Sequence, residues 1–86
     1  MNKPQQALVL STCEIMSAYP HLSVEDALGD ARQIERWVRK QGLGDPEAEA
    51  LLLTAACRLL AADSELVPAS AVERAVRIYE AVREAG

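Results

Sequence analysis

Side chains capable of chemistry are few in this chain of 86 residues, and they lie far apart in the sequence. A nucleophile needs an activating base beside it, and a metal site needs several His, Cys or carboxylate ligands that converge. The single histidine, His21, lies in a segment that we expect to be a loop. Cys13 and Cys57 are separated by a long stretch and form no Cys-x-x-Cys motif. The sequence therefore predicts that the chain is not an enzyme and that it uses no cofactor and no metal ion.

The surroundings of the two cysteines and the start of the chain indicate a cellular compartment. Cys13 and Cys57 are flanked by apolar residues, which favours the interpretation that they are small core side chains in a reducing environment. The alternative is a disulfide between them. No apolar run reaches the roughly 18 residues that a membrane-spanning helix needs. The first 16 residues contain one lysine and no clear cleavage site for a signal peptide. We therefore expect a cytoplasmic protein without membrane contact.

The composition predicts an all-α fold. The chain is 50 % hydrophobic, mostly Ala and Leu, and it contains no Phe, one Trp and two Tyr. Ala and Leu are the strongest helix formers, whereas the β-branched and aromatic residues that strands prefer are scarce. The net charge of −4 argues against nonspecific binding of nucleic acid, which needs clustered Lys and Arg.

Proline, glycine and capping residues divide the chain into four expected helices within a single domain, residues 1–86. The helices are expected at about 4–19, 23–41, 46–62 and 70–84. Their starts are marked by the capping-box spacings Ser23/Asp26 and Ser70/Glu73, and by Asp45 followed by Pro46. Because the loops are short, successive helices should run roughly antiparallel in a compact bundle.

The helix at 46–62 should lie at the centre of the bundle. Its polar residues Glu47, Thr54 and Arg58 fall on one narrow line, and the rest of its surface is apolar. Such a helix must be covered on about three sides. Either the other three helices cover it, or a second copy of the chain covers part of it.

Apolar residues at spacings of three and four predict the buried faces of the remaining helices. In the first helix this leaves Ser11, Glu14 and Ser17 on the polar side. In the last helix, Glu73 and Arg77 have the spacing of an exposed ion pair. The predicted buried residues are Leu8, Val9, Thr12, Cys13, Ile15, Met16 and Tyr19 in the first helix, Val24, Ala27, Leu28, Ala31, Ile34 and Val38 in the second, and Val72, Ala75, Val76, Tyr79 and Val82 in the last.

Trp37 and the charges near it suggest a surface for a partner. Trp37 lies at the border of the buried face, where it either closes the edge of the core or forms part of a protein interface, since Trp and Arg are enriched there. Acidic residues on the second and third helices could attract a basic partner. The basic residues Arg32, Arg36, Arg39 and Lys40 support the alternative of nucleic-acid binding. The predicted partner-binding residues are Asp26, Asp30, Arg36, Trp37, Lys40, Asp45, Glu47 and Glu49.

The segment SVEDALGDARQIERWVRKQG, with Ala27, Ala31, Ile34, Trp37 and Val38, resembles helices in small accessory proteins of bacteriophages and other mobile elements, among them the anti-CRISPR inhibitors of host defence. The resemblance implies a stand-alone inhibitor or adaptor that binds a host protein complex, including a nucleoprotein complex. Some such inhibitors place acidic side chains where a nucleic-acid backbone would dock, and the acidic residues named above are the candidates. The alternative function is a structural subunit of an obligate homo- or hetero-oligomer, such as a homodimer.

Overall fold

The computed structural model describes residues 1–86 and consists of four helices joined by short loops. It contains no strand, so the all-α prediction is confirmed. The third helix has the expected bounds. The helices are α1 (Lys3–Ala18), α2 (Val24–Arg39), α3 (Pro46–Ala62) and α4 (Pro68–Ala85).

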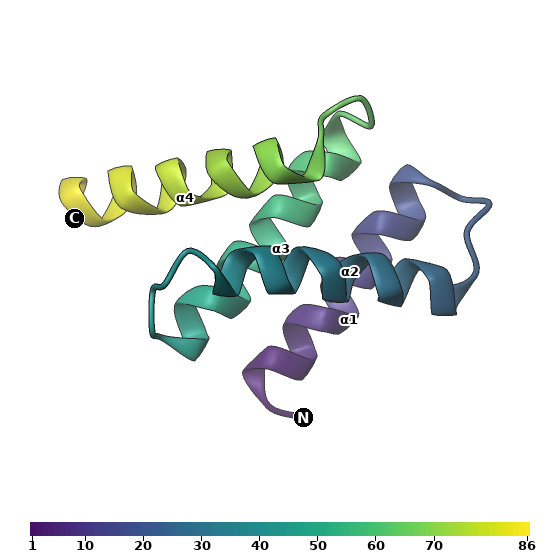
Figure 1. Cartoon of the computed structure of the whole chain (residues 1–86), viewed down its shortest axis with the longest axis horizontal. Coiled ribbons are helices and arrows are strands. Elements are labelled where there is room, and N and C mark those ends of the chain that lie inside the picture. Colours follow the sequence, from purple (N-terminus) through teal and green to yellow (C-terminus); the bar gives the residue numbers. More distant parts are fainter.

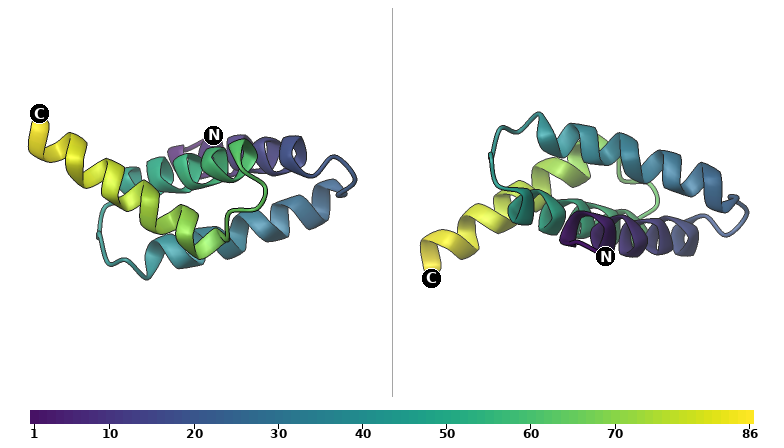
Figure 2. Two further views of the ribbon diagram at one scale, coloured as in Figure 1. Left: turned by 90° about the horizontal axis from the view of Figure 1, so that it is seen from above. Right: turned by 90° about the horizontal axis from the view of Figure 1, so that it is seen from below.

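α3 is the central helix, as predicted: α2 and α3 each contact all three other helices, but the contacts of α3 are the more extensive, chiefly those with α1 (Figure 1). α1 and α3 lie side by side and run in the same direction, and α2 packs across them (Figures 1 and 2). α4 contacts α2 and α3 but not α1, and its C-terminal part extends beyond the other helices. Successive helices therefore cross one another instead of lying antiparallel as the loop lengths suggested.

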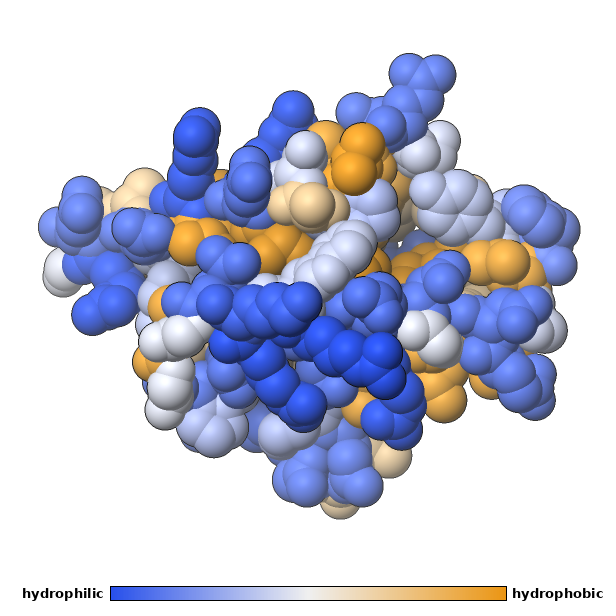
Figure 3. Space-filling view, viewed as in Figure 1, coloured by the Kyte–Doolittle hydropathy of each residue, from blue (hydrophilic) through white to orange (hydrophobic).

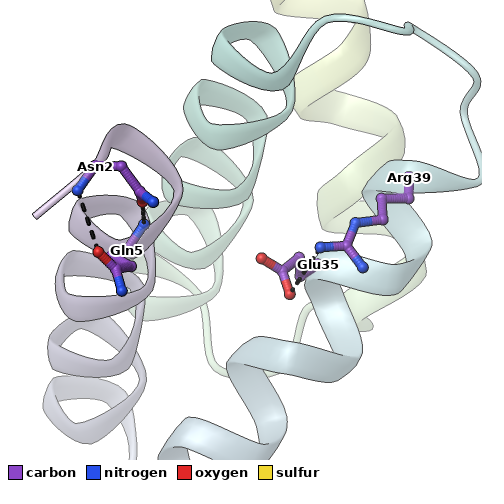
Figure 4. A network of polar contacts seen from close by, with 4 residues as sticks. All are labelled: Asn2, Gln5, Glu35 and Arg39. Carbon is purple, nitrogen blue, oxygen red and sulfur yellow. Dashed lines mark hydrogen bonds and ion pairs between the residues drawn. The ribbon is translucent and has the colours of Figure 1, made fainter.

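The starts of the first three helices are fixed by side chains that satisfy free backbone N–H groups. At the start of α1, the side chains of Asn2 and Gln5 each accept a hydrogen bond from the other's backbone N–H, at 2.9 and 3.2 Å (Figure 4). The Ser23 hydroxyl accepts a hydrogen bond from the backbone N–H of Asp26 at 3.1 Å, which confirms Ser23 as the cap of α2. Asp45 caps α3 in the same way. Such caps each stabilise a helix by about 1 kcal/mol.

The predicted start of α4 is wrong. The helix begins at Pro68, and Val67 precedes it without any side-chain cap. Ser70 and Glu73 lie inside the helix, so they form no capping box. The fixed φ angle of proline and its missing N–H suit the first helical position, and this preference places the start of α4 ahead of Ser70.

The core is built largely from alanine, which allows α1 and α3 to approach closely. Ala7 and Ser11 on α1 are buried, as are Ala56 and Cys57 on α3. Short side chains at such a contact bring two helix backbones near each other and leave little space between them. The buried apolar residues are Ala7, Ile15, Ala27, Ala31, Ile34, Val38, Ala48, Leu52, Leu53, Ala56, Cys57, Leu60, Ala71, Val72 and Ala75.

The buried face of α1 differs from the predicted one. Ser11, expected on the polar side, is completely buried, whereas Cys13 and Val9, expected in the core, are exposed. The reason is the close contact with α3, which selects the side of α1 with the shortest side chains. The ends of the apolar faces of α2 and α4 are also uncovered, since Val24 and Val82 are exposed.

Ser11 is the one buried side chain whose polar atom has no hydrogen-bond partner. We expect Ser11→Ala to raise the free energy of unfolding by about 1 kcal/mol, because an unpaired buried hydroxyl costs that much or more. Urea denaturation would measure the change, with the exposed Ser17→Ala on the same helix as control for helix propensity. A less stable Ser11→Ala protein would show instead that the hydroxyl has a favourable contact with the Cys57 thiol.

None of the four helices combines the length and the apolar character that crossing a lipid bilayer requires.

Candidate functional site

A hollow of about 300 Å³ opens where α2 passes the C-terminal ends of α1 and α3, beside the start of α4. Its floor is apolar, formed by the buried side chains of Ile15, Ile34 and Leu60. Three polar residues, His21, Asp30 and Gln33, also line it. We call this hollow the Trp37 pocket; its lining is Ile15, Tyr19, His21, Leu22, Asp30, Gln33, Ile34, Trp37, Leu60 and Pro68.

One face of α2 supplies the largest share of this lining. Asp30, Gln33, Ile34 and Trp37 are spaced by three or four residues, so they lie on the same side of the helix. Ile34 is directed into the core, while Asp30 and Gln33 are exposed at the edge. The helix therefore presents an apolar centre and a polar rim to the same hollow.

Two loops complete the Trp37 pocket, and one hydrogen bond connects them. The Tyr19 hydroxyl, at the end of α1, donates to the backbone carbonyl of Ser64, in the α3–α4 loop, at 3.1 Å. His21 and Leu22 follow Tyr19 in the α1–α2 loop, and Pro68 follows the α3–α4 loop. The Tyr19–Ser64 bond therefore holds together the two loops that form this side of the pocket.

Trp37 closes an edge of the core, which is one of the two roles that the sequence left open. Its side chain packs against the core, yet it stays partly exposed. It lines the Trp37 pocket and also a smaller hollow of about 190 Å³ between α2 and α4, which Lys40 and Val72 line as well. The indole of the only tryptophan is thus a shared wall between two surface hollows.

The structure does not bring the predicted acidic residues together. Asp30 lines the Trp37 pocket, and Asp26 lies one turn earlier on the exposed side of α2. Asp45, Glu47 and Glu49 lie at the start of α3, near the C-terminal end of α2, a helix roughly 24 Å long. There Glu49 lines a hollow of about 220 Å³ together with Glu35 and Arg39. Asp45 and Glu47 line a separate hollow of about 420 Å³ between α1 and α3. Of the predicted acidic residues, only Asp30 therefore shares a site with Trp37.

The basic residues of α2 lie on its exposed side. Figure 3 shows the resulting hydrophilic surface over α2, with apolar surface on either side of it. Arg36 donates to the side-chain oxygen of Gln33 at 3.2 Å, which orients that amide at the edge of the Trp37 pocket. Arg39 forms an ion pair with Glu35 at 3.6 Å (Figure 4). Lys40 is exposed and lines the smaller hollow beside Trp37.

Sequence reasoning missed most of the Trp37 pocket. His21 was assigned no role, and Tyr19 and Leu22 were not connected with Trp37. One signal could have drawn attention to the pair Tyr19 and Trp37: they are two of only three large aromatic rings in the chain. The contact between the two loops has no signature in the sequence, since it depends on how α1 and α3 pack.

No three His, Cys, Asp or Glu side chains gather into a group that could hold a metal ion. Burial raises the pKa of the Cys57 thiol from 9.0 to about 11. The Glu14 carboxylate adds to the rise, and the Ser11 hydroxyl opposes it because it can donate a hydrogen bond to the thiolate form. A thiol with this pKa stays protonated at neutral pH and is a poor nucleophile. Comparison of the chain with protein-family models, with curated proteins and with solved structures found no match.

Proposed function

We propose that this chain is a small protein-binding module that acts as an inhibitor or adaptor on a host protein complex, in the manner of bacteriophage accessory proteins. The Trp37 pocket is the centre of the proposed contact. The observation that supports it is a hollow with an apolar floor, two aromatic residues and one exposed carboxylate, that of Asp30, at its edge. Trp and Tyr are the residues that most often dominate binding energy at protein interfaces.

The dimensions of the Trp37 pocket suit a side chain of a partner better than a cofactor. Its volume of about 300 Å³ lies at the lower limit of small-molecule sites. One large apolar side chain could enter it and bury its surface against Ile15, Ile34 and Leu60. An amphipathic helix or a loop of the partner would present such an anchor.

The rim adds a preference for positive charge near that anchor. The Asp30 carboxylate is exposed and has no ion-pair partner within the chain. A Lys or Arg of the partner, about one helical turn from its apolar anchor, could pair with Asp30. The charge of −4 would also favour encounter with a basic surface. Proteins that handle nucleic acid present such surfaces, which supports a nucleoprotein complex as the target.

The test compares three variants as bait in a bacterial lysate. We expect Asp30→Arg and Trp37→Leu each to reduce retention of the bound proteins at least about tenfold, because each removes a contact that anchors the partner. Glu47→Arg makes the same change of charge at the start of α3, and this variant should still retain the bound proteins. Quantitative mass spectrometry of the retained proteins measures the difference, and circular dichroism checks that each variant is folded.

Two results would contradict the proposal. Loss of binding in Glu47→Arg alone would place the contact at the start of α3. Proteins retained equally by all variants would show that the Trp37 pocket takes no part.

A further inference from the structure

The Trp37 pocket and the smaller hollow beside it lie on one flank of α2. Asp30 and Gln33 line the pocket, and Lys40 lines the smaller hollow. Trp37 lines both. Along the chain these four residues are spaced by three, four and three positions, so their side chains project from the same side of the helix. One binding partner could therefore reach both hollows at once.

The start of α4 forms the opposite side of both hollows. Pro68 borders the Trp37 pocket. Ala69 and Glu73 border the smaller hollow, and the buried Val72 lies at its floor. The two hollows are thus successive parts of one seam between α2 and α4, with the Trp37 indole between them. This seam faces the reader in the view shared by Figures 1 and 3, and apolar surface is exposed along it.

The distance between the hollows matches two turns of a helix. On α2, the lining of the Trp37 pocket is centred about six residues before the lining of the smaller hollow, which is roughly 9 Å along the axis. Side chains seven residues apart on a helix point in nearly the same direction and are about 10.5 Å apart, whereas a spacing of four residues gives only about 6 Å. A helix lying along the seam could therefore fill both hollows with two side chains seven residues apart.

We propose that this seam binds an amphipathic helix of another protein, with one apolar anchor in each hollow. The inference rests on the proposed function, because one anchor is the side chain that enters the Trp37 pocket, and it adds a second anchor, a spacing and a direction. The pocket of about 300 Å³ takes an aromatic side chain, and the hollow of about 190 Å³ takes a smaller one such as leucine. A small residue lies between the two anchors, where the partner helix passes over the indole.

The charges along the seam determine the direction of the partner helix. Asp30 is exposed and unpaired, at the end of the Trp37 pocket farthest from the smaller hollow. A Lys or Arg about one turn beyond the aromatic anchor would pair with it. Cations are favourable at the C-terminal end of a helix, so the partner helix runs antiparallel to α2. At the other end of the seam Lys40 and Glu73 carry opposite charges, since the predicted pair of Glu73 with Arg77 does not form, and they add no net preference.

A library of displayed peptides tests this pattern. The library keeps one helix rich in alanine and glutamine, without tryptophan, and randomises two anchor positions seven residues apart and the positions four residues before the first anchor and four after the second. Wild-type protein should enrich an apolar residue at the first anchor, an aromatic residue at the second, and Lys or Arg after the second. Asp30→Arg should enrich Glu or Asp at that last position instead. Glu47→Arg, with the same change of charge away from the seam, should enrich the wild-type pattern.

Filling the smaller hollow tests the second anchor directly. Ala69 is exposed at the second position of α4, so Ala69→Leu should fold and occupy that hollow. Replacing the first anchor of a selected peptide by alanine should weaken binding to the wild type at least about tenfold and binding to Ala69→Leu less than about twofold. Because Trp37 is the only tryptophan, its fluorescence measures both affinities.

The outcomes separate this inference from the proposed function. Peptides that need only the aromatic anchor and the cation, and that lose equally little in the wild type and in Ala69→Leu, would overturn the second anchor and leave the proposed function intact. Enrichment of Lys or Arg before the first anchor would overturn the antiparallel direction. Peptides that Trp37→Leu binds as well as the wild type, or a library from which nothing is enriched, would overturn both proposals.

Discussion

Replacing Leu53 with aspartate is expected to unfold the chain. Leu53 is 1 % exposed in the centre of α3. The substitution loses about 2 kcal/mol of apolar burial and forces either a buried carboxylate or its protonated form into the core, at a further cost of several kcal/mol. A domain of this size has a stability of about 4 to 13 kcal/mol. Far-ultraviolet circular dichroism, followed through a urea titration, would measure the loss.

A matched control lies two residues away on the same helix. Leu51 is 58 % exposed on the outer side of α3, next to the polar line of Glu47, Thr54 and Arg58. Leu51→Asp should cost less than about 1 kcal/mol, mainly through the lower helix propensity of aspartate. An equally large loss in Leu51→Asp would mean that a second copy covers the outer side of α3, which was the alternative left open by the sequence.

Alkaline pH is expected to destabilise the protein through Cys57. Its pKa is about 11 in the folded state against 9.0 for an unperturbed thiol, so between these values the unfolded chain binds fewer protons than the folded one. Stability therefore falls as the pH rises from 9 to about 11. The difference of two units between the folded and unfolded pKa values of Cys57 corresponds to about 2.7 kcal/mol in the free energy of unfolding. All of this stability is present below pH 9.

Urea titrations of the wild type and of Cys57→Ala over this pH range isolate that component. All other ionisable groups are common to both proteins, so their contribution cancels in the comparison. The variant should be less stable at pH 7 because it leaves a small cavity, and the difference should shrink as the pH rises. A difference that does not change with pH would contradict a thiol held protonated by burial.

The elements that were predicted well from the sequence are marked by sequence patterns that span only a few residues. Asp45 and Pro46 mark the start of α3, and the pattern of Ala27, Ala31 and Ile34 marks the buried face of α2. Such patterns depend only on local geometry, since spacing along a helix decides which side chains share a face. Predictions from such patterns therefore do not depend on how the neighbouring helices pack.

The errors concern contacts between distant parts of the chain. In α1, short side chains occur on several sides, so periodicity did not show that Ser11 faces α3 and that Cys13 faces solvent. In α4, Val82 continues the buried face, but the body of the protein ends before the helix does. The Trp37 pocket depends on the Tyr19–Ser64 hydrogen bond between two loops, for which the sequence contains no periodic signal. Helix packing determined all three outcomes.

The place of Trp37 in the wall of its pocket also determines the optical properties of the protein. Because it is the only tryptophan, the intrinsic fluorescence of the unlabelled chain comes almost entirely from that wall. An apolar side chain that enters the pocket would displace water from the indole and shift the emission to shorter wavelength. The spectrum of one residue can thus report whether the Trp37 pocket is occupied.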